Sequence, residues 1–309
     1  MATLNLPPLD SELITDPLEG SGPSSVRRFW RRFARHRLAL VGLSILLILV
    51  LVSIFAPFLT SYSPTAPNLT QVLLPPSAAH PLGTDDLGRD VLARLMYGGR
   101  ISFMVGFFSM IIATSIGVVW GATSGYLGGI WDRLMMRFVD LVMSFPAIFL
   151  LLVVLNLTGA NASVALMILY LGLFGWTGLS RIVRSQVLSL KTQEYVEAAR
   201  AQGSGTARIL FKHVLPGAMA PVWVSAAFGV AGAMLAEASL DFLGFGLQPQ
   251  IPSWGNMLDS AESYIVTHPL LILAPGLVIT IAVVSINFVG DALRDALDPR
   301  STAGMQRIG

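Results

Sequence analysis

Cysteine is absent from all 309 residues of the sequence, which excludes disulfides, thiolate metal sites and a cysteine nucleophile. Charge is scarce too, because only 12% of the residues are charged whereas 54% are hydrophobic. A single soluble core could not bury so much apolar surface. The composition therefore predicts a protein that lies in a lipid bilayer.

Lysine occurs only twice, as Lys191 and Lys212. A phosphate-binding P-loop needs a glycine directly before its lysine, so that backbone N–H groups can wrap around phosphate. Leucine and phenylalanine precede the two lysines here. This sequence therefore lacks that nucleotide site, and we expect the energy for any transport to come from a partner or from an ion gradient.

Histidine is rare and scattered, at positions 36, 80, 213 and 268, and these positions have no metal-ligand spacing. Three nearby carboxylates, Asp85, Asp86 and Asp90, are candidates for binding a cation. The simpler interpretation is that Thr84 and Asp85 begin a helix and that Asp90 pairs with Arg94 four residues later. We therefore predict no metal site and no catalytic residue, and a membrane enzyme finds no support.

Six apolar segments are long enough to cross a bilayer, which takes roughly 20 residues of helix. One uncharged run, residues 141–180, is too long for a single crossing and is interrupted by polar residues 156–163, so it predicts two helices. Pro146 is expected to kink the first of these. The other four predicted spans lie within residues 38–59, 101–130, 214–236 and 264–290.

The basic residues predict the orientation, because Lys and Arg near span ends stay on the cytoplasmic side. Seventeen of the twenty fall on one side of the six predicted spans, together with both termini. The exceptions are Arg89, Arg94 and Arg100. Both termini are therefore predicted to be cytoplasmic, and since the basic excess follows topology we expect no nucleic acid partner.

The spans divide the chain into five parts. Residues 1–25 are predicted to be a disordered cytoplasmic tail, 26–60 an interfacial helix with the first span, and 61–100 a periplasmic segment. Residues 101–290 form the core with five spans and a coupling loop at 190–216, and residues 291–309 form a cytoplasmic tail.

The basic arm at residues 26–37 interleaves Trp30 and Phe33 with arginines at helical spacing. This pattern favours a helix at the level of the lipid headgroups. The first alternative to an interfacial helix is that the arm has no ordered helix and its charge only sets the membrane topology. The second alternative is an arm that binds nucleic acid.

A polar insert, residues 194–216, lies between two predicted spans and reads as two short helices broken at Gly203 to Gly205. A motor in the cytoplasm can push a membrane helix only through a rigid protrusion that fits a groove. The insert has the small side chains, flanking charge and helix breaker that such a protrusion requires. Gly203 and Gly205 permit positive φ angles, and Pro216 suits the start of the next helix.

The insert also carries the sequence EAARAQG, followed by Leu215 and Pro216. This pattern is similar to the EAA signature of permease subunits of binding-protein-dependent ABC importers. Residues 80–102, 239–258 and 287–300 resemble the C-type subunit of the dipeptide and oligopeptide importers within the peptide and nickel branch. The chain departs from the general pattern at His213, which the peptide branch often shares, and in the outer segment at residues 250–251.

The resemblance, which covers residues 27–300, implies an all-α polytopic membrane protein with six transmembrane helices in the type I ABC importer permease fold. It implies a homologous B-type permease, two cytoplasmic ATP-binding subunits and an extracytoplasmic substrate-binding protein as partners. ATP and Mg would be bound by the ATPases, with no cofactor in this chain. The residues that it assigns to ATPase coupling are Glu194, Glu197, Ala198, Ala199, Gly203, Leu215 and Pro216.

Three polar or aromatic residues are candidates for the translocation pathway or gate. Asp140 lies near the cytoplasmic end of the third span and could instead pair with Arg137 or Arg133. Glu237 ends the fifth span, where it could anchor the interface or contact substrate or the binding protein. Trp254 belongs to an outer segment that could dock another protein or plug the pathway.

The predicted function is that of an inner-membrane permease subunit, forming half of a pore that imports dipeptides or oligopeptides. The resemblance leaves nickel complexes and glutathione open as substrates. An ion-driven secondary transporter is the alternative from another class, although such folds place charges near the midplane and the spans here carry few.

Overall fold

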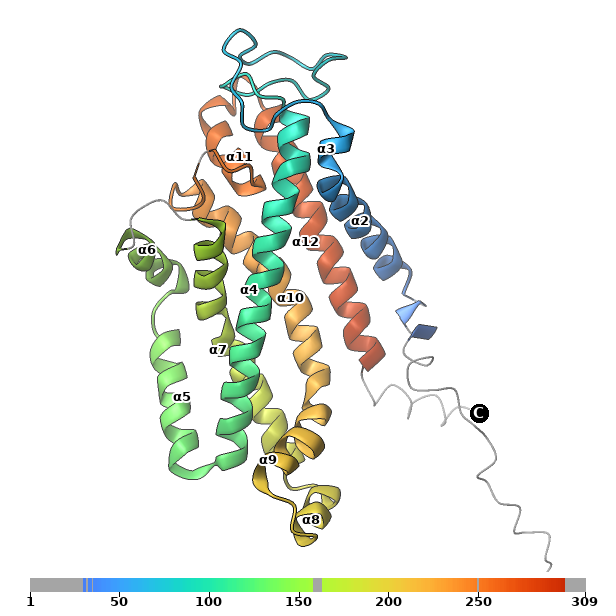
Figure 1. Cartoon of the computed structure of the whole chain (residues 1–309), viewed down its shortest axis with the longest axis vertical. Helices are drawn as coiled ribbons and strands as arrows, with labels where there is room; N and C mark the ends of the chain where they lie inside the picture. The colour runs from blue at the N-terminus through green and yellow to red at the C-terminus, as the bar shows by residue number, and fades with distance from the viewer. Residues whose placement is uncertain (1–29, 32, 35, 158–162, 249, 298–309) are drawn as a thin grey trace, which may run out of the picture.

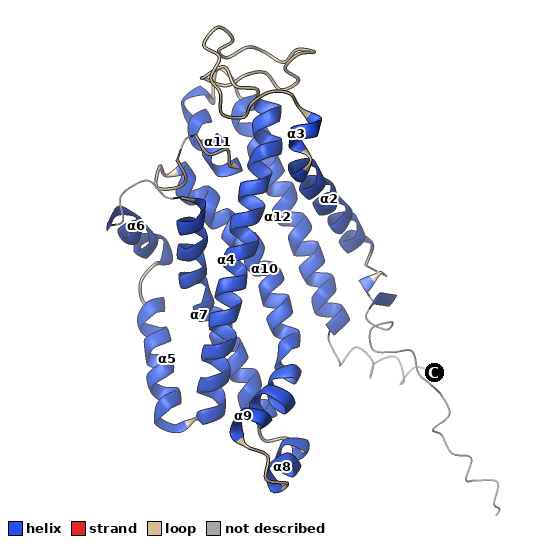
Figure 2. Ribbon diagram, in the orientation of Figure 1, coloured by secondary structure: helices blue, strands red, loops and turns tan. Residues whose placement is uncertain are grey.

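The computed structural model describes residues 30–31, 33–34, 36–157, 163–248 and 250–297. Over this part of the chain the protein is helical and has no strand (Figures 1 and 2). The predicted N-terminal tail, half of the basic arm, and residues 158–162 and 298–309 lie outside it. Residues 291–297, predicted to belong to the C-terminal tail, are instead the last residues of a helix. The helices are α2 Arg37–Ile54, α3 Ala56–Leu59, α4 Val91–Leu127, α5 Gly129–Met143, α6 Ala147–Leu157, α7 Val164–Leu190, α8 Glu194–Ala201, α9 Thr206–Arg208, α10 Leu215–Phe242, α11 Trp254–Ala261 and α12 Leu270–Leu297.

The long helices form one bundle with two distinct ends (Figure 1). One end carries α8, α9 and the turn between α4 and α5, and we call it the α8 end. The other carries α3, α11 and the irregular segment of residues 60–90, and we call it the α11 end. Figure 2 shows loops gathered at this end of the bundle.

Five helices of the described chain are long and apolar enough to cross a membrane: α2, α4, α7, α12 and the continuous helix Thr206–Phe242 that includes α10. A sixth crossing exists only if α5 and α6 are counted as one span, and these two helices meet at 85°. The prediction of a third span starting near Leu141 is therefore wrong in its start, since α5 already begins at Gly129. The bend lies at Pro146, as expected, because proline cannot donate the helical hydrogen bond and disfavours helix at the residue before it.

α4 is much longer than predicted, with 37 residues that begin at Val91 rather than near 101. A helix of that length spans about 56 Å, well beyond the roughly 30 Å of bilayer hydrocarbon. Asp90 begins it, because its carboxylate accepts a hydrogen bond from the Ala93 N–H at 2.6 Å. The helix can therefore connect the bilayer directly to the 60–90 segment.

α4 packs most closely against α7, along a row of glycines at positions 117, 121 and 125. A Cβ atom at Gly121 would collide with the Ser180 carbonyl oxygen, so only glycine lets the two backbones approach this closely. Small residues at every fourth position drive helix association in lipid, where apolar surface alone gives no preference for another helix.

Gly121→Ala should lower the free energy of unfolding by roughly 1–3 kcal/mol, because the added methyl group forces α4 away from α7. Denaturant unfolding of the purified protein in detergent measures this change. Gly178→Ala is the matched control, since Gly178 lies on α7 with nothing within 4 Å of its would-be Cβ. Equal effects of the two substitutions would contradict this account of the packing.

Candidate functional site

The first candidate site is the insert at the α8 end. Its first helix, α8, ends in two backbone hydrogen bonds that define a Schellman cap, from Ser204 N–H to the Ala199 carbonyl at 3.1 Å and from Gly203 N–H to the Arg200 carbonyl at 3.0 Å. The cap requires a left-handed residue at Gly203, and its φ is +79°. Gly205 was also predicted to use its freedom, but its φ is an ordinary −67°. Gly203 alone therefore makes the turn.

α8 presents one face to the protein and the other to its surroundings. Val196 and Ala199 are buried, and Val196 belongs to the same apolar cluster as Ile209 and Val214 at the start of the next helix. Glu194, Glu197 and Ala198 are exposed, as is the Tyr195 ring. The insert is thus a short ridge attached to the bundle by its apolar face.

The second half of the insert joins α10 without a break. α9 leads into one turn of π-helix, Ile209–Val214, which continues into α10 at Leu215. Pro216 lies in the first turn of α10, as predicted, although there is no break before it, since helix runs from Thr206 to Phe242. Pro216 has no N–H to donate to the preceding turn, and the wider π-turn before it accommodates that loss. Leu215 is half-buried and Pro216 is exposed.

Asp140 lies on α5 at the α8 half of the bundle and is about half-exposed. Its carboxylate accepts a hydrogen bond from the Arg181 Nη2 of α7 at 2.6 Å. The predicted partners Arg137 and Arg133 were wrong, because α7 supplies an arginine directly across from α5. A second pair, Asp132 with Arg184 at 2.5 Å, ties the same two helices together. Asp140 therefore has an identified role in holding α5 to α7.

The second candidate site is a buried polar cluster where α10 ends, at the α11 end. The carboxylate of Asp241 accepts hydrogen bonds from the Leu247 N–H at 2.6 Å and from the Ser253 Oγ at 2.5 Å. One turn earlier, Glu237 is only 1% exposed, and its Oε2 accepts from the Ser102 Oγ of α4 at 3.3 Å. Both carboxyl groups therefore lie inside the protein rather than at an open mouth, which favours the anchoring role for Glu237.

Trp254 fills the space between α4 and α10 and is 1% exposed. Its Nε1 donates to the Leu95 carbonyl at 2.9 Å, and its backbone N–H donates to the Ser102 Oγ at 3.2 Å. The next residue, Gly255, has no room for a side chain, because its would-be Cβ lies 2.6 Å from the Ala238 Cα. This burial favours a packing role for Trp254 over a place on the pathway.

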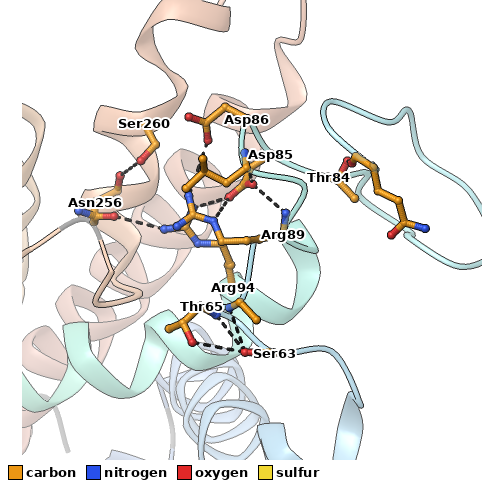
Figure 3. Close-up of polar contacts among 12 residues, drawn as sticks. Ser63, Thr65, Thr84, Asp85, Asp86, Arg89, Arg94, Asn256 and Ser260 are labelled. Atoms are coloured by element: carbon orange, nitrogen blue, oxygen red, sulfur yellow. Dashed lines mark hydrogen bonds and ion pairs between the residues drawn. The ribbon is translucent and has the colours of Figure 1, made fainter. Parts of the chain in front are cut away.

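Asn256 extends the cluster to α4 and the 60–90 segment (Figure 3). Its Oδ1 accepts from the Arg94 Nη2 at 3.2 Å, and the Arg94 Nη1 donates to the Asp85 Oδ2 at 2.6 Å. Arg89 donates to the same oxygen through Nε at 2.7 Å. We call the linked residues Asp241, Ser253, Asn256, Arg94 and Asp85 the outer joint.

The outer joint corrects two expectations. Arg94 pairs with Asp85, not with Asp90, because Asp90 caps α4 and binds His80 Nδ1 through its other oxygen at 2.8 Å. Thr84 and Asp85 do not begin a helix either, since Thr84 forms an isolated bridge with Asp90. No group of three or more His, Cys, Asp or Glu side chains in the described ranges has the arrangement of a metal site.

Most of the outer joint did not follow from the sequence. Its members Ser253, Asn256 and Arg94 were not candidate site residues, although Ser253 and Asn256 lie beside Trp254 in the run Ser-Trp-Gly-Asn. Serine is a favoured residue directly before a helix, and the Ser253 Oγ does cap α11 by accepting a hydrogen bond from the Asn256 backbone N–H at 3.0 Å. The long-range partners on α4 carry no such local signal.

Comparison with known sequences decides the family. The family described as binding-protein-dependent transport system inner membrane component matches residues 117–303, and the N-terminal transmembrane domain of oligopeptide transport permease C matches residues 24–76. The chain belongs to this permease family. It is a multi-pass inner-membrane transport component.

Curated relatives of the permease span nearly its whole length. It is 41% identical over 277 residues to the dipeptide transport system permease protein DppC of Alkalihalophilus pseudofirmus, covering 89% of this chain and 90% of that one. It is 40% identical to the oligopeptide transport system permease protein OppC of Bacillus subtilis, over 87% and 88% of the two chains. It is 38% identical to the glutathione transport system permease protein GsiD of Pectobacterium atrosepticum, over 89% and 91%.

Proposed function

We propose that the permease forms half of the pore of an ATP-driven importer of dipeptides or oligopeptides. Its partners in this proposal are a homologous B-type permease, two cytoplasmic ATP-binding subunits and an extracytoplasmic binding protein. The family match and the names of the relatives support the importer class. The family match also disfavours the ion-driven secondary transporter, since the family is defined by dependence on a binding protein.

The α8 end faces the cytoplasm in this proposal. The basic residues support this orientation, because in the described chain only Arg89, Arg94 and Arg100 lie toward the α11 end. Each of these three has a specific partner within the protein. Arg89 and Arg94 bind Asp85, and Arg100 donates through Nε to the Ser53 carbonyl at 2.6 Å. These three outer basic residues are therefore accounted for by contacts within the fold.

The insert is the coupling element, and one observation carries this assignment. The exposed side chains of Glu197 and Ala198 form a ridge on a helix that is fixed at both ends, by the Gly203 cap and by the apolar contact of Val196. A ridge fixed in this way transmits force from an ATPase groove into α10, which starts in the insert. Glu194, Ala199, Leu215 and Pro216 shape the ridge and its connection to the bundle.

In this proposal the permease crosses the membrane six times, with α5 and α6 counted as one bent span, and so forms its half of the pore.

Reconstitution tests the proposal. The permease, coexpressed with its genomic neighbours, should purify with two ATP-binding proteins, and vesicles that hold the complex should accumulate dipeptides only with ATP and the binding protein. Purification as a lone chain, with uptake driven by an ion gradient, would contradict it. Glutathione is the second substrate to assay, because a glutathione permease is among the relatives at 38% identity. Nickel complexes are the third.

A further inference from the structure

The outer joint connects four parts of the chain. Asp241 belongs to α10, Ser253 and Asn256 to the α11 segment, Arg94 to α4 and Asp85 to the 60–90 segment. Every link in this series is a hydrogen bond of 3.2 Å or less. The end of α10 is therefore tied to the 60–90 segment through two intermediate elements.

The joint is both buried and tightly packed. Asn256 and Arg94 are each 2% exposed, and buried polar links are costly to break because water cannot replace them. The would-be Cβ of Gly255 lies 2.8 Å from the Asp241 Oδ2, and that of Gly246 would collide with the Asp241 Oδ1. The backbone thus encloses the Asp241 carboxylate from two sides, and the α11 segment cannot slide along α10.

α10 also reaches the opposite end of the molecule. The helix Thr206–Phe242 begins in the insert, where its first turns pack against α8, and its last turn carries Asp241 of the outer joint. Its two ends are thus attached to the two surfaces where partners act in the proposed function. Figure 1 shows α10 running between these ends of the bundle.

We propose that Asn256 and Arg94 are positioning residues that make the 60–90 segment and α10 move as one body. A partner that acts on the outer face then acts on the insert through α10, and the insert acts on the outer face by the same route. The proposal rests on the proposed function for the identity of these partners. The joint itself is a property of this chain alone.

The first test measures whether the two parts move together. This chain has no cysteine, so Leu69→Cys and Leu243→Cys give it two thiols for spin labels, at exposed positions on the 60–90 segment and at the end of α10, and the partner subunits are used in cysteine-free form. In the complete transporter, the distance distribution between the labels should stay narrow and unchanged between the nucleotide-free and the vanadate-trapped states. A distribution that shifts between these states would overturn the proposal without any change at Asn256.

The second test separates positioning from stability. Asn256→Leu should leave assembly and basal ATP hydrolysis within about twofold of the unmodified complex, whereas stimulation of hydrolysis by peptide-loaded binding protein should fall about tenfold. Asn256→Asp should retain stimulation, because its carboxylate can still accept from Arg94. If Asn256→Leu loses basal and stimulated hydrolysis in parallel, the role of Asn256 is only structural and the proposal is overturned. Normal stimulation of the Asn256→Leu complex would also contradict a positioning role for Asn256. Failure to purify ATP-binding partners at all contradicts the proposed function instead.

Discussion

Gly203→Pro should reduce peptide uptake about a hundredfold while membrane insertion stays intact. Proline fixes φ near −65° and has no N–H, so it cannot adopt the +79° of Gly203 or donate to the Arg200 carbonyl. A loss of about 3 kcal/mol in the docking-competent form of the insert corresponds to about two orders of magnitude in its population. Uptake into vesicles and ATP hydrolysis, measured on the same preparation, report the uncoupling.

Gly205→Pro is the matched control for this prediction. Gly205 lies two residues further along the same turn, and its φ of −67° is the angle that proline prefers. Uptake should therefore stay within about twofold of the unmodified transporter. Full uptake by Gly203→Pro, or equal losses at both positions, would contradict the assignment of Gly203 as the fixed turn of the coupling ridge.

Asp85→Ala should destabilise the protein more than Gly121→Ala does. The Asp85 carboxylate accepts hydrogen bonds from four donors, the backbone N–H groups of Leu87 and Arg89 and the side chains of Arg89 and Arg94. Removing one partner of a buried ion pair leaves the other charge uncompensated, which costs roughly 3–5 kcal/mol. Denaturant unfolding in detergent, followed by tryptophan fluorescence, measures the loss.

Asp86→Ala provides the comparison, since it removes the same charge at the next position. Asp86 makes one longer contact, 3.6 Å to the Arg89 Nη2, and its side chain is 30% exposed. We expect a loss of under about 1 kcal/mol, as for other partly exposed ion pairs. If the two alanine variants unfold alike, net charge rather than the buried geometry sets the stability of this region.

The local features of the fold followed well from the sequence. Long apolar runs predicted the spans, Pro146 predicted the bend between α5 and α6, and the glycine at 203 predicted the turn in the insert. These features depend on a single residue or on one continuous segment. The start of α4 was misplaced by ten residues, because Arg94 and Arg100 made the segment look too polar for a membrane helix, although both side chains donate hydrogen bonds within the protein.

The pairing of side chains across the bundle did not follow from the sequence. Asp140 with Arg181, and Arg94 with Asp85 and Asn256, join elements whose relative positions only the fold defines. Neighbours along the chain were the natural expectation for these charges, and in both cases a residue from another element lies closer to the charge. Which residues line the pathway is likewise a property of the assembled pair of permeases, so that assignment stays a prediction for Asp140, Glu237 and Trp254.

In the proposed importer an ATP-binding subunit binds the insert, and site-specific cross-linking can detect this contact. Ala198→Cys places the only thiol of the chain on the exposed ridge of α8, where it can carry a photoreactive group. Illumination of the complete transporter should join this position to an ATP-binding subunit, whereas the same group at Leu69→Cys on the 60–90 segment should not. An insert that forms no adduct with a nucleotide-hydrolysing partner in an actively transporting complex would contradict the account.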